Sequence, residues 1–104
     1  MHINTNCVQA GYTPKNGESR VLPIYQSTTY RYETSEEMGA LFDLEKDGYF
    51  YTRLQNPTCD MVASKLCQLE GGAAARLTSS GRAATLLAVT TISEAGGPVV
   101  CRRK

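Results

Sequence analysis

The sequence contains no tryptophan, and its single histidine stands at position 2. The longest apolar stretch, around Leu86 to Val89, is far shorter than the roughly 20 residues that a membrane-spanning helix needs. The net charge of +1 gives no strongly basic surface of the kind that binds nucleic acids. We therefore expect no membrane partner and no nucleic-acid partner.

Closely spaced metal ligands are also missing. The four cysteines form no CxxC pair and stand at positions 7, 59, 67 and 101. A zinc site would need paired ligands, so we expect no metal. Disulfide staples belong to small secreted domains, and no signal peptide opens the chain. We therefore expect reduced cysteines and a cytoplasmic location.

Neither GxxxxGK[ST] nor GxGxxG occurs, which disfavours nucleoside triphosphates and dinucleotides as ligands. The hydrophobic share of 41% and the charged share of 20% are those of a globular protein rather than a disordered one. A chain of 104 residues fits one small domain. Such a domain buries roughly two-thirds of its unfolded surface.

The first half of the chain, 1–55, reads as an extended arm with one short helix. VLPIYQSTTYRY is rich in β-branched and aromatic residues, which favour an extended conformation. Ser35 to Leu44 is predicted to be helical, with Ser35 as its N-cap. Tyr49 to Arg53 is predicted to be a second extended segment. The alternative for the arm is an ordinary edge strand of this domain.

The second half, 56–104, shows helix and strand signals in alternation. Asn56-Pro57-Thr58 starts a helix that Gly71-Gly72 ends, and Lys65 is predicted to be a solvated charge on it. A second helix is predicted over Gly81 to about Ser93, ended by Gly96-Gly97. The predicted strands are 73–77 and 98–101. This order predicts an α/β fold with one right-handed, parallel βαβ unit.

A hydroxyl-rich turn, Thr78 to Gly81, immediately precedes the second of these helices. Free N–H groups and the helix dipole make such a turn suitable for an anion. Arg53 adds a permanently charged fork of donors that suits a phosphate. The alternative is that Ser79 or Ser80 only caps the helix.

The motifs YTRLQNPT, LEGG and SSG, at these separations, resemble the Cys/Met-metabolism family of pyridoxal-phosphate enzymes. The stretches GESRVLPIYQSTTY and LFDLEKDGYFYTR are most similar to O-acetylhomoserine sulfhydrylase. The resemblance runs from about Thr5 to about Val100 and covers the first quarter or so of a typical member. It implies pyridoxal 5′-phosphate as cofactor, and O-acetylhomoserine and a sulfur donor as substrates of the intact relative.

For the fold, the resemblance implies an N-terminal arm, 1–55, that lies against neighbouring subunits of a homotetramer. Residues 56–104 would be the opening βαβ portion of an aspartate-aminotransferase-like, fold type I large domain. Tyr51 and Arg53 would reach into the neighbouring subunit and bind its cofactor phosphate. The backbone at Ser80, Gly81 and Arg82 would bind the phosphate held by its own subunit. Arg82 departs from the Met or Gln usual there, although a backbone contact does not depend on the side chain.

The resemblance also implies which groups are missing. The family's Schiff-base lysine lies well beyond position 104, so no catalytic residue is expected here and the chain alone should be inactive. Gly97-Pro98 and the residues after it differ from relatives, which favours a truncated or frame-shifted product. Two alternatives to O-acetylhomoserine sulfhydrylase are a cystathionine γ-synthase and a methionine γ-lyase. Another, of a different class, is a non-catalytic remnant or assembly segment.

Overall fold

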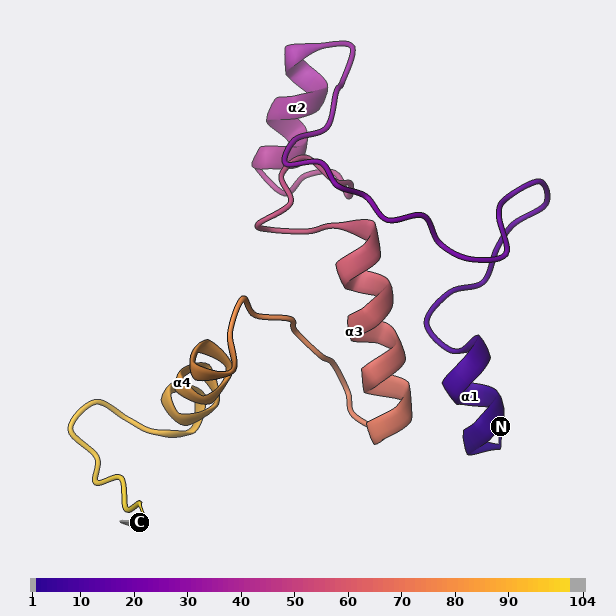
Figure 1. Ribbon diagram of the computed structural model, residues 1–104. Coiled ribbons are helices and arrows are strands. Elements are labelled where there is room, and N and C mark those ends of the chain that lie inside the picture. Colours follow the sequence, from indigo (N-terminus) through magenta and orange to yellow (C-terminus); the bar gives the residue numbers. More distant parts are fainter. Residues whose placement is uncertain (1, 102–104) are drawn as a thin grey trace.

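The computed structural model describes residues 2–101, and its regular elements are helices joined by irregular segments (Figure 1). The described chain contains α1 (Ile3–Gln9), α2 (Ser35–Phe42), α3 (Pro57–Glu70) and α4 (Gly81–Ile92). Helix α2 lies at the opposite end of the molecule from both termini (Figure 1). The basic C-terminal end, 102–104, lies outside the described residues.

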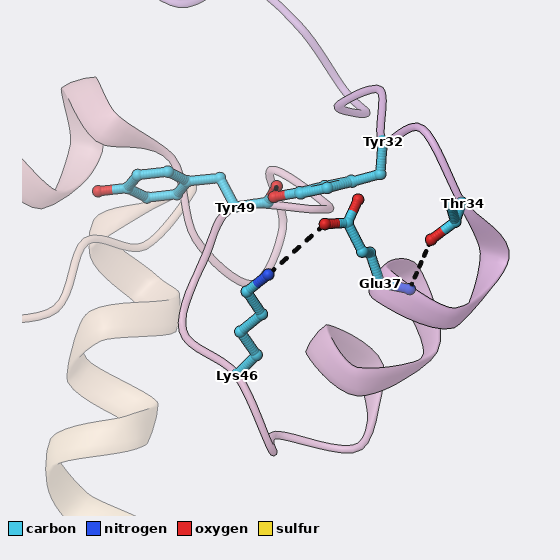
Figure 2. Close-up of polar contacts among 5 residues, drawn as sticks. All are labelled: Tyr32, Thr34, Glu37, Lys46 and Tyr49. Atoms are coloured by element: carbon cyan, nitrogen blue, oxygen red, sulfur yellow. Dashed lines mark hydrogen bonds and ion pairs between the residues drawn. The ribbon is translucent and has the colours of Figure 1, made fainter.

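Helix α2 has its N-cap one residue earlier than the sequence predicted, and it ends at Phe42 rather than at Leu44. Thr34, not Ser35, is the N-cap, because the Thr34 hydroxyl accepts from the backbone N–H of Glu37 at 3.2 Å (Figure 2). The Glu37 carboxylate also lies 3.7 Å from the ammonium group of Lys46. Both side chains are well exposed, so this ion pair contributes little stability.

Helix α3 is built as its sequence predicts. The Asn56 side chain accepts from the backbone N–H of Thr58 at 2.9 Å and of Cys59 at 3.4 Å. Pro57 occupies the first helical position, where its missing N–H has no intrahelical acceptor to lose. Gly71, with a φ of 65°, ends the helix in the left-handed conformation. The predicted start and stop signals are confirmed.

Helix α1 was not predicted, and it is held by its contact with α3. The Lys65 ammonium donates to the carbonyls of Cys7 at 3.1 Å and Val8 at 3.4 Å, near the negative end of the α1 dipole. Gly11 has a φ of 90°, and a Cβ there would lie 2.7 Å from the carbonyl oxygen of Met61. The Lys65 ammonium therefore has a contact that the prediction of a solvated charge did not include, since it fastens α1 to α3.

The predicted parallel strands do not form within the described residues. Segments 73–77 and 98–101 are irregular, and the β-type pairing described is one isolated antiparallel bridge between Thr29 and Tyr51. The predicted βαβ unit is therefore wrong for residues 2–101. The physical reason is that a strand gains its hydrogen bonds from a neighbouring strand, and a parallel sheet is normally covered on both faces. Helix α4, between those segments, is confirmed, although it ends at Ile92, ahead of Gly96-Gly97.

The chain is open, and its core is small. Leu41 and Ala10 are the buried hydrophobic side chains among the described residues. The accessible surface is 9313 Å², whereas a compact protein of this mass exposes about 5,700 Å². The radius of gyration is 17.9 Å, against about 13 Å for a compact chain of this length. The chain thus buries roughly two-fifths of its unfolded surface, and the expectation of two-thirds is wrong.

Candidate anion site at two chain turns

The first part of the site is the start of α4. Ser80 is in an extended conformation, and its hydroxyl accepts from the backbone N–H of Ala83 at 3.1 Å. The Thr78 hydroxyl donates to the Ser80 carbonyl at 2.9 Å, which fixes the turn before the helix. The N–H groups of Gly81 and Arg82 belong to the first helical turn, where no intrahelical acceptor exists. No acceptor among residues 2–101 takes either group.

Gly81 has no structural need of being glycine within the described chain. It is not among the glycines with positive φ, and a Cβ built on it would have nothing within 4 Å. Glycine in a helix costs roughly 0.5–1 kcal/mol relative to alanine. What the missing side chain provides is open access to the backbone N–H groups, which suits a ligand that approaches closely.

The second part is the turn at Tyr51 to Leu54. The Tyr51 carbonyl accepts from the N–H groups of Leu54 at 3.0 Å and Gln55 at 3.1 Å. The predicted extended segment therefore continues only to Tyr51, and Arg53 lies in the turn. The Arg53 guanidinium carbon lies 5.2 Å from the centre of the Tyr51 ring, within cation–π range. Arg53 makes no ion pair with any described residue, so its charge is available to a ligand.

Asn56 holds this turn against the arm, and it is the buried polar residue of the described chain, at 3% exposure. Its amide nitrogen has two N–H groups and lies within hydrogen-bond distance of three acceptors, the Tyr25 carbonyl at 3.0 Å, the Tyr30 hydroxyl at 3.2 Å and the Thr52 hydroxyl at 3.2 Å. Sequence reasoning identified Asn56 only as a helix cap. The hydrogen bonds of its amide nitrogen could not be predicted from nearby residues, because the partners Tyr25 and Tyr30 are more than 25 residues away.

The structure pairs the predicted site residues in two groups. Tyr51 lies with Arg53 in one turn, and Ser80, Gly81 and Arg82 are consecutive at the other. A hollow of about 390 Å³ is lined by Arg53 and Thr78, but by neither Tyr51 nor the Ser80–Arg82 turn. No hydrogen bond or ion pair within residues 2–101 joins the two groups.

One ionisable group close to Asp60 is perturbed. Burial, and then the nearby Asp60 carboxylate, raise the pKa of the Tyr49 hydroxyl above its usual range. Asp60 itself lines the hollow with Arg53, so the hollow holds charges of both signs. Tyr49 stays protonated at neutral pH and can donate a hydrogen bond, but it cannot serve as a base there.

Other kinds of site find no support in the part of the chain that the structure describes. Its His, Cys, Asp and Glu side chains form no cluster of three or more that could hold a metal ion. None of helices α1–α4 is long and apolar enough to cross a bilayer.

Comparison with known proteins gives the site its context. The chain is 43% identical over 101 residues to O-acetyl-L-homoserine sulfhydrylase 1 of Thermus thermophilus, covering 96% of this chain and 24% of that protein. It is 41% identical over 100 residues to the homocysteine synthase of Schizosaccharomyces pombe, covering 95% of this chain and 23% of that protein. The chain thus spans about a quarter of the length of these relatives.

A solved structure matches as well. The putative O-acetylhomoserine (thiol)-lyase of Campylobacter jejuni superposes with a TM-score of 0.79 at 33% identity, over 92% of this chain and 23% of that one. Its crystal structure was determined with a pyridoxyl-lysine monophosphate. The family model described as Cys/Met metabolism PLP-dependent enzyme matches residues 4–104. This chain therefore belongs to the Cys/Met metabolism family of pyridoxal-phosphate-dependent enzymes.

Proposed function

We propose that this chain is the N-terminal part of an O-acetylhomoserine sulfhydrylase-like enzyme, in which it binds the phosphate of pyridoxal 5′-phosphate. The observation that carries the proposal is the pair of free N–H groups at Gly81 and Arg82. The chain belongs to a pyridoxal-phosphate-dependent family, and neither backbone conformation nor packing within the described chain requires a glycine at position 81. A phosphate dianion suits these donors and the positive end of the α4 dipole.

The residues present fit the phosphate group. Gly81 and Arg82 offer backbone N–H groups, and the missing Cβ leaves them open to a close approach. Ser80 keeps its hydroxyl on the helix cap, so its contribution is the shape of the turn. Arg53 offers an unpaired guanidinium, and Tyr51 a hydroxyl that can donate to a phosphate oxygen.

No hydrogen bond or ion pair joins the two groups within residues 2–101, although Arg53 and Thr78 line one hollow. The assignment of the two groups to different subunits rests on the family resemblance. In this proposal Tyr51 and Arg53 bind the cofactor phosphate of a neighbouring subunit, and the protein is a homo-oligomer, a tetramer by family resemblance. Residues 1–34 of the arm would then lie against a neighbour, which accords with the exposure of Val21 and Ile24, 75% and 76%.

The reaction proposed for the complete enzyme replaces the acetoxy group of O-acetylhomoserine with sulfide or methanethiol. Pyridoxal phosphate, when bound, acts as the electron sink for such chemistry at an amino-acid carbon. The residues of this chain bind and orient the cofactor, and none of them is proposed to be catalytic. Lys65 and Lys46 are both engaged by other groups, with the α1 carbonyls and Glu37 respectively.

A γ-lyase is the second candidate, because the chain is 47% identical over 78 residues to the L-methionine gamma-lyase of Porphyromonas gingivalis. A chimera in which residues 1–104 replace the matching quarter of the Thermus sulfhydrylase tests the cofactor-binding part of the proposal. We expect it to bind pyridoxal 5′-phosphate and to form homocysteine from O-acetylhomoserine and sulfide. Absence of cofactor binding by a folded chimera would reject the proposal. Cofactor binding with faster breakdown of methionine would favour the lyase.

A further inference from the structure

Asn56 uses the two ends of its amide for different purposes. The oxygen caps α3 by accepting from Thr58 and Cys59. The nitrogen donates away from the helix, to the Tyr25 carbonyl and the Thr52 hydroxyl. Capping needs only an oxygen, and Asp or Ser caps a helix about as well as Asn. The donor end of Asn56 therefore has a task that capping does not explain.

Thr52 receives that donor, and it stands between Tyr51 and Arg53. Its backbone N–H donates to the Thr28 carbonyl at 2.9 Å, and its hydroxyl donates to the Ser27 carbonyl. Because that hydroxyl proton is already used, the oxygen faces Asn56 as an acceptor. Thr52 is thus held by three hydrogen bonds. The Tyr51 hydroxyl and the Arg53 guanidinium, on either side of it, make no hydrogen bond or ion pair with a described residue.

Burial makes these contacts specific. Asn56 is 3% exposed, and a buried amide that loses a partner pays the desolvation cost of the group left unsatisfied. The two N–H groups of Asn56 face acceptors on the arm, at Tyr25 and Tyr30, and on the turn, at Thr52, so the amide joins the turn to the arm. The contact with Thr52 therefore fastens the turn to the start of α3.

We propose that Asn56, acting through Thr52, is a positioning residue for phosphate recognition by Tyr51 and Arg53. Its amide nitrogen fixes the backbone of the turn and thereby the point from which both side chains reach the phosphate. The inference rests on the proposed function, because it assumes that this pair binds the phosphate of pyridoxal 5′-phosphate.

The test uses the chimera of residues 1–104 with the remainder of the Thermus sulfhydrylase. Two dissociation constants are measured by absorbance titration, one for pyridoxal 5′-phosphate and one for pyridoxal, which lacks the phosphate. Their ratio is the phosphate preference of the protein. Asn56→Asp keeps the capping oxygen but replaces the amide donors by a charged carboxylate oxygen. Thr52→Val adds no charge, and it removes the acceptor on the turn together with the hydroxyl donation to the Ser27 carbonyl. Circular dichroism monitors folding of each variant.

Thr58→Val is the matched control. The Thr58 hydroxyl accepts from the Tyr25 N–H at 3.0 Å and donates to the Pro23 carbonyl at 3.0 Å, so it fastens the arm without touching the turn. We expect Asn56→Asp and Thr52→Val each to lower the phosphate preference by about ten-fold, with pyridoxal affinity unchanged. Thr58→Val should leave the preference at the parent value.

Equal losses for both ligands would mean that Asn56 has only a structural role, and would overturn the inference. So would an unchanged preference in folded Asn56→Asp, or a loss in Thr58→Val as large as in Asn56→Asp. Should Asn56→Asp not fold, the same measurement on Thr52→Val decides.

Arg53→Ala separates this inference from the proposed function on which it rests. If Arg53→Ala leaves the phosphate preference unchanged, the proposed function is wrong at this residue; if it lowers the preference and Asn56→Asp does not, only the positioning role fails.

Discussion

Replacing Leu86 in the middle of α4 by glutamate is expected to weaken self-association of the isolated 104-residue chain. Helix α4 is apolar on several sides, and Leu86 and Ile92 are 62% and 85% exposed. The chain as a whole exposes about 3,600 Å² more than a compact protein of its mass. A standard protein interface removes about 800 Å² from each partner, so the uncovered surface suffices for several such contacts.

The magnitude follows from the exposure of the side chain. Full burial of a leucine is worth about 1.5–3 kcal/mol, and 62% of Leu86 is still exposed, so covering it in an oligomer contributes about 1–2 kcal/mol. Leu86→Glu removes this contribution and adds a charge that the interface must desolvate. We expect the association constant to fall by roughly 5- to 30-fold. The helix itself should persist, because glutamate is a good helix former.

Sedimentation velocity over a concentration series measures the association, and far-UV circular dichroism monitors the helices. Thr91→Glu is the control, since it adds the same charge to the same helix without removing apolar surface. Wild-type chain that stays monomeric at all concentrations, with a cooperative thermal transition, would refute the reasoning. An equal effect of Thr91→Glu would show that charge, rather than apolar contact, governs the association.

Two further predictions concern catalysis and folding. The isolated chain with added pyridoxal 5′-phosphate should show no sulfhydrylase or lyase turnover, since no residue here is expected to be catalytic; turnover that persists after further purification would contradict this. Gly11→Ala should release α1 from α3, because the new Cβ would lie 2.7 Å from the Met61 oxygen in a backbone conformation with a φ of 90°. Hydrogen exchange of the α1 amides should quicken by more than the roughly ten-fold that backbone strain alone explains. Gly17→Ala, with a φ of 85° and nothing within 4 Å, is the control for that strain.

Local signals in the sequence were enough for the helices whose ends are chemically marked. Asn56, Pro57 and Gly71 mark α3, and Ser80 marks the start of α4, because caps act within a few residues of the chain. Helix α1 carried no such signal. It is seven residues long and is stabilised by Lys65, which lies more than 50 residues away.

The strands were predicted from their residue types, which do not show whether a neighbouring strand is present to pair with. Segment 73–77 is apolar and of strand length, yet a strand exists only where a neighbour completes its hydrogen bonds. Relatives are about four times as long as this chain, so most residues that could provide neighbours in them have no counterpart here.

One part of the candidate site could be predicted from local signals, and the other part depends on distant contacts. The Ser80–Arg82 turn could be predicted because a hydroxyl, a glycine and a helix start are adjacent in the sequence. The segment Tyr49 to Arg53 was predicted as extended, and the turn within it was missed. Thr52 in that turn is held by Ser27 and Thr28, which are far from it in the sequence. Long-range contacts of this kind leave no pattern at the residues that they position.

The central claim is that one phosphate is bound by Arg53 of one subunit and by the Gly81 turn of another. Two variants of the chimera test it. Arg53→Ala removes a charge-assisted contact worth about 1.5–3 kcal/mol, or roughly ten- to a hundred-fold in cofactor affinity. Gly81→Val is expected to cover the free N–H groups, and its Cβ would have nothing within 4 Å in this chain.

The decisive measurement is the activity of mixed oligomers from coexpression of these two variants, at limiting pyridoxal 5′-phosphate. Each variant alone should be weakly active, whereas some sites in a mixed oligomer combine the wild-type Arg53 of one subunit with the wild-type Gly81 of another. The account predicts that part of the activity returns, in oligomers whose mixed composition is verified by mass. Verified mixed oligomers without any recovery would contradict it and would place Arg53 and Gly81 on the same phosphate within one chain.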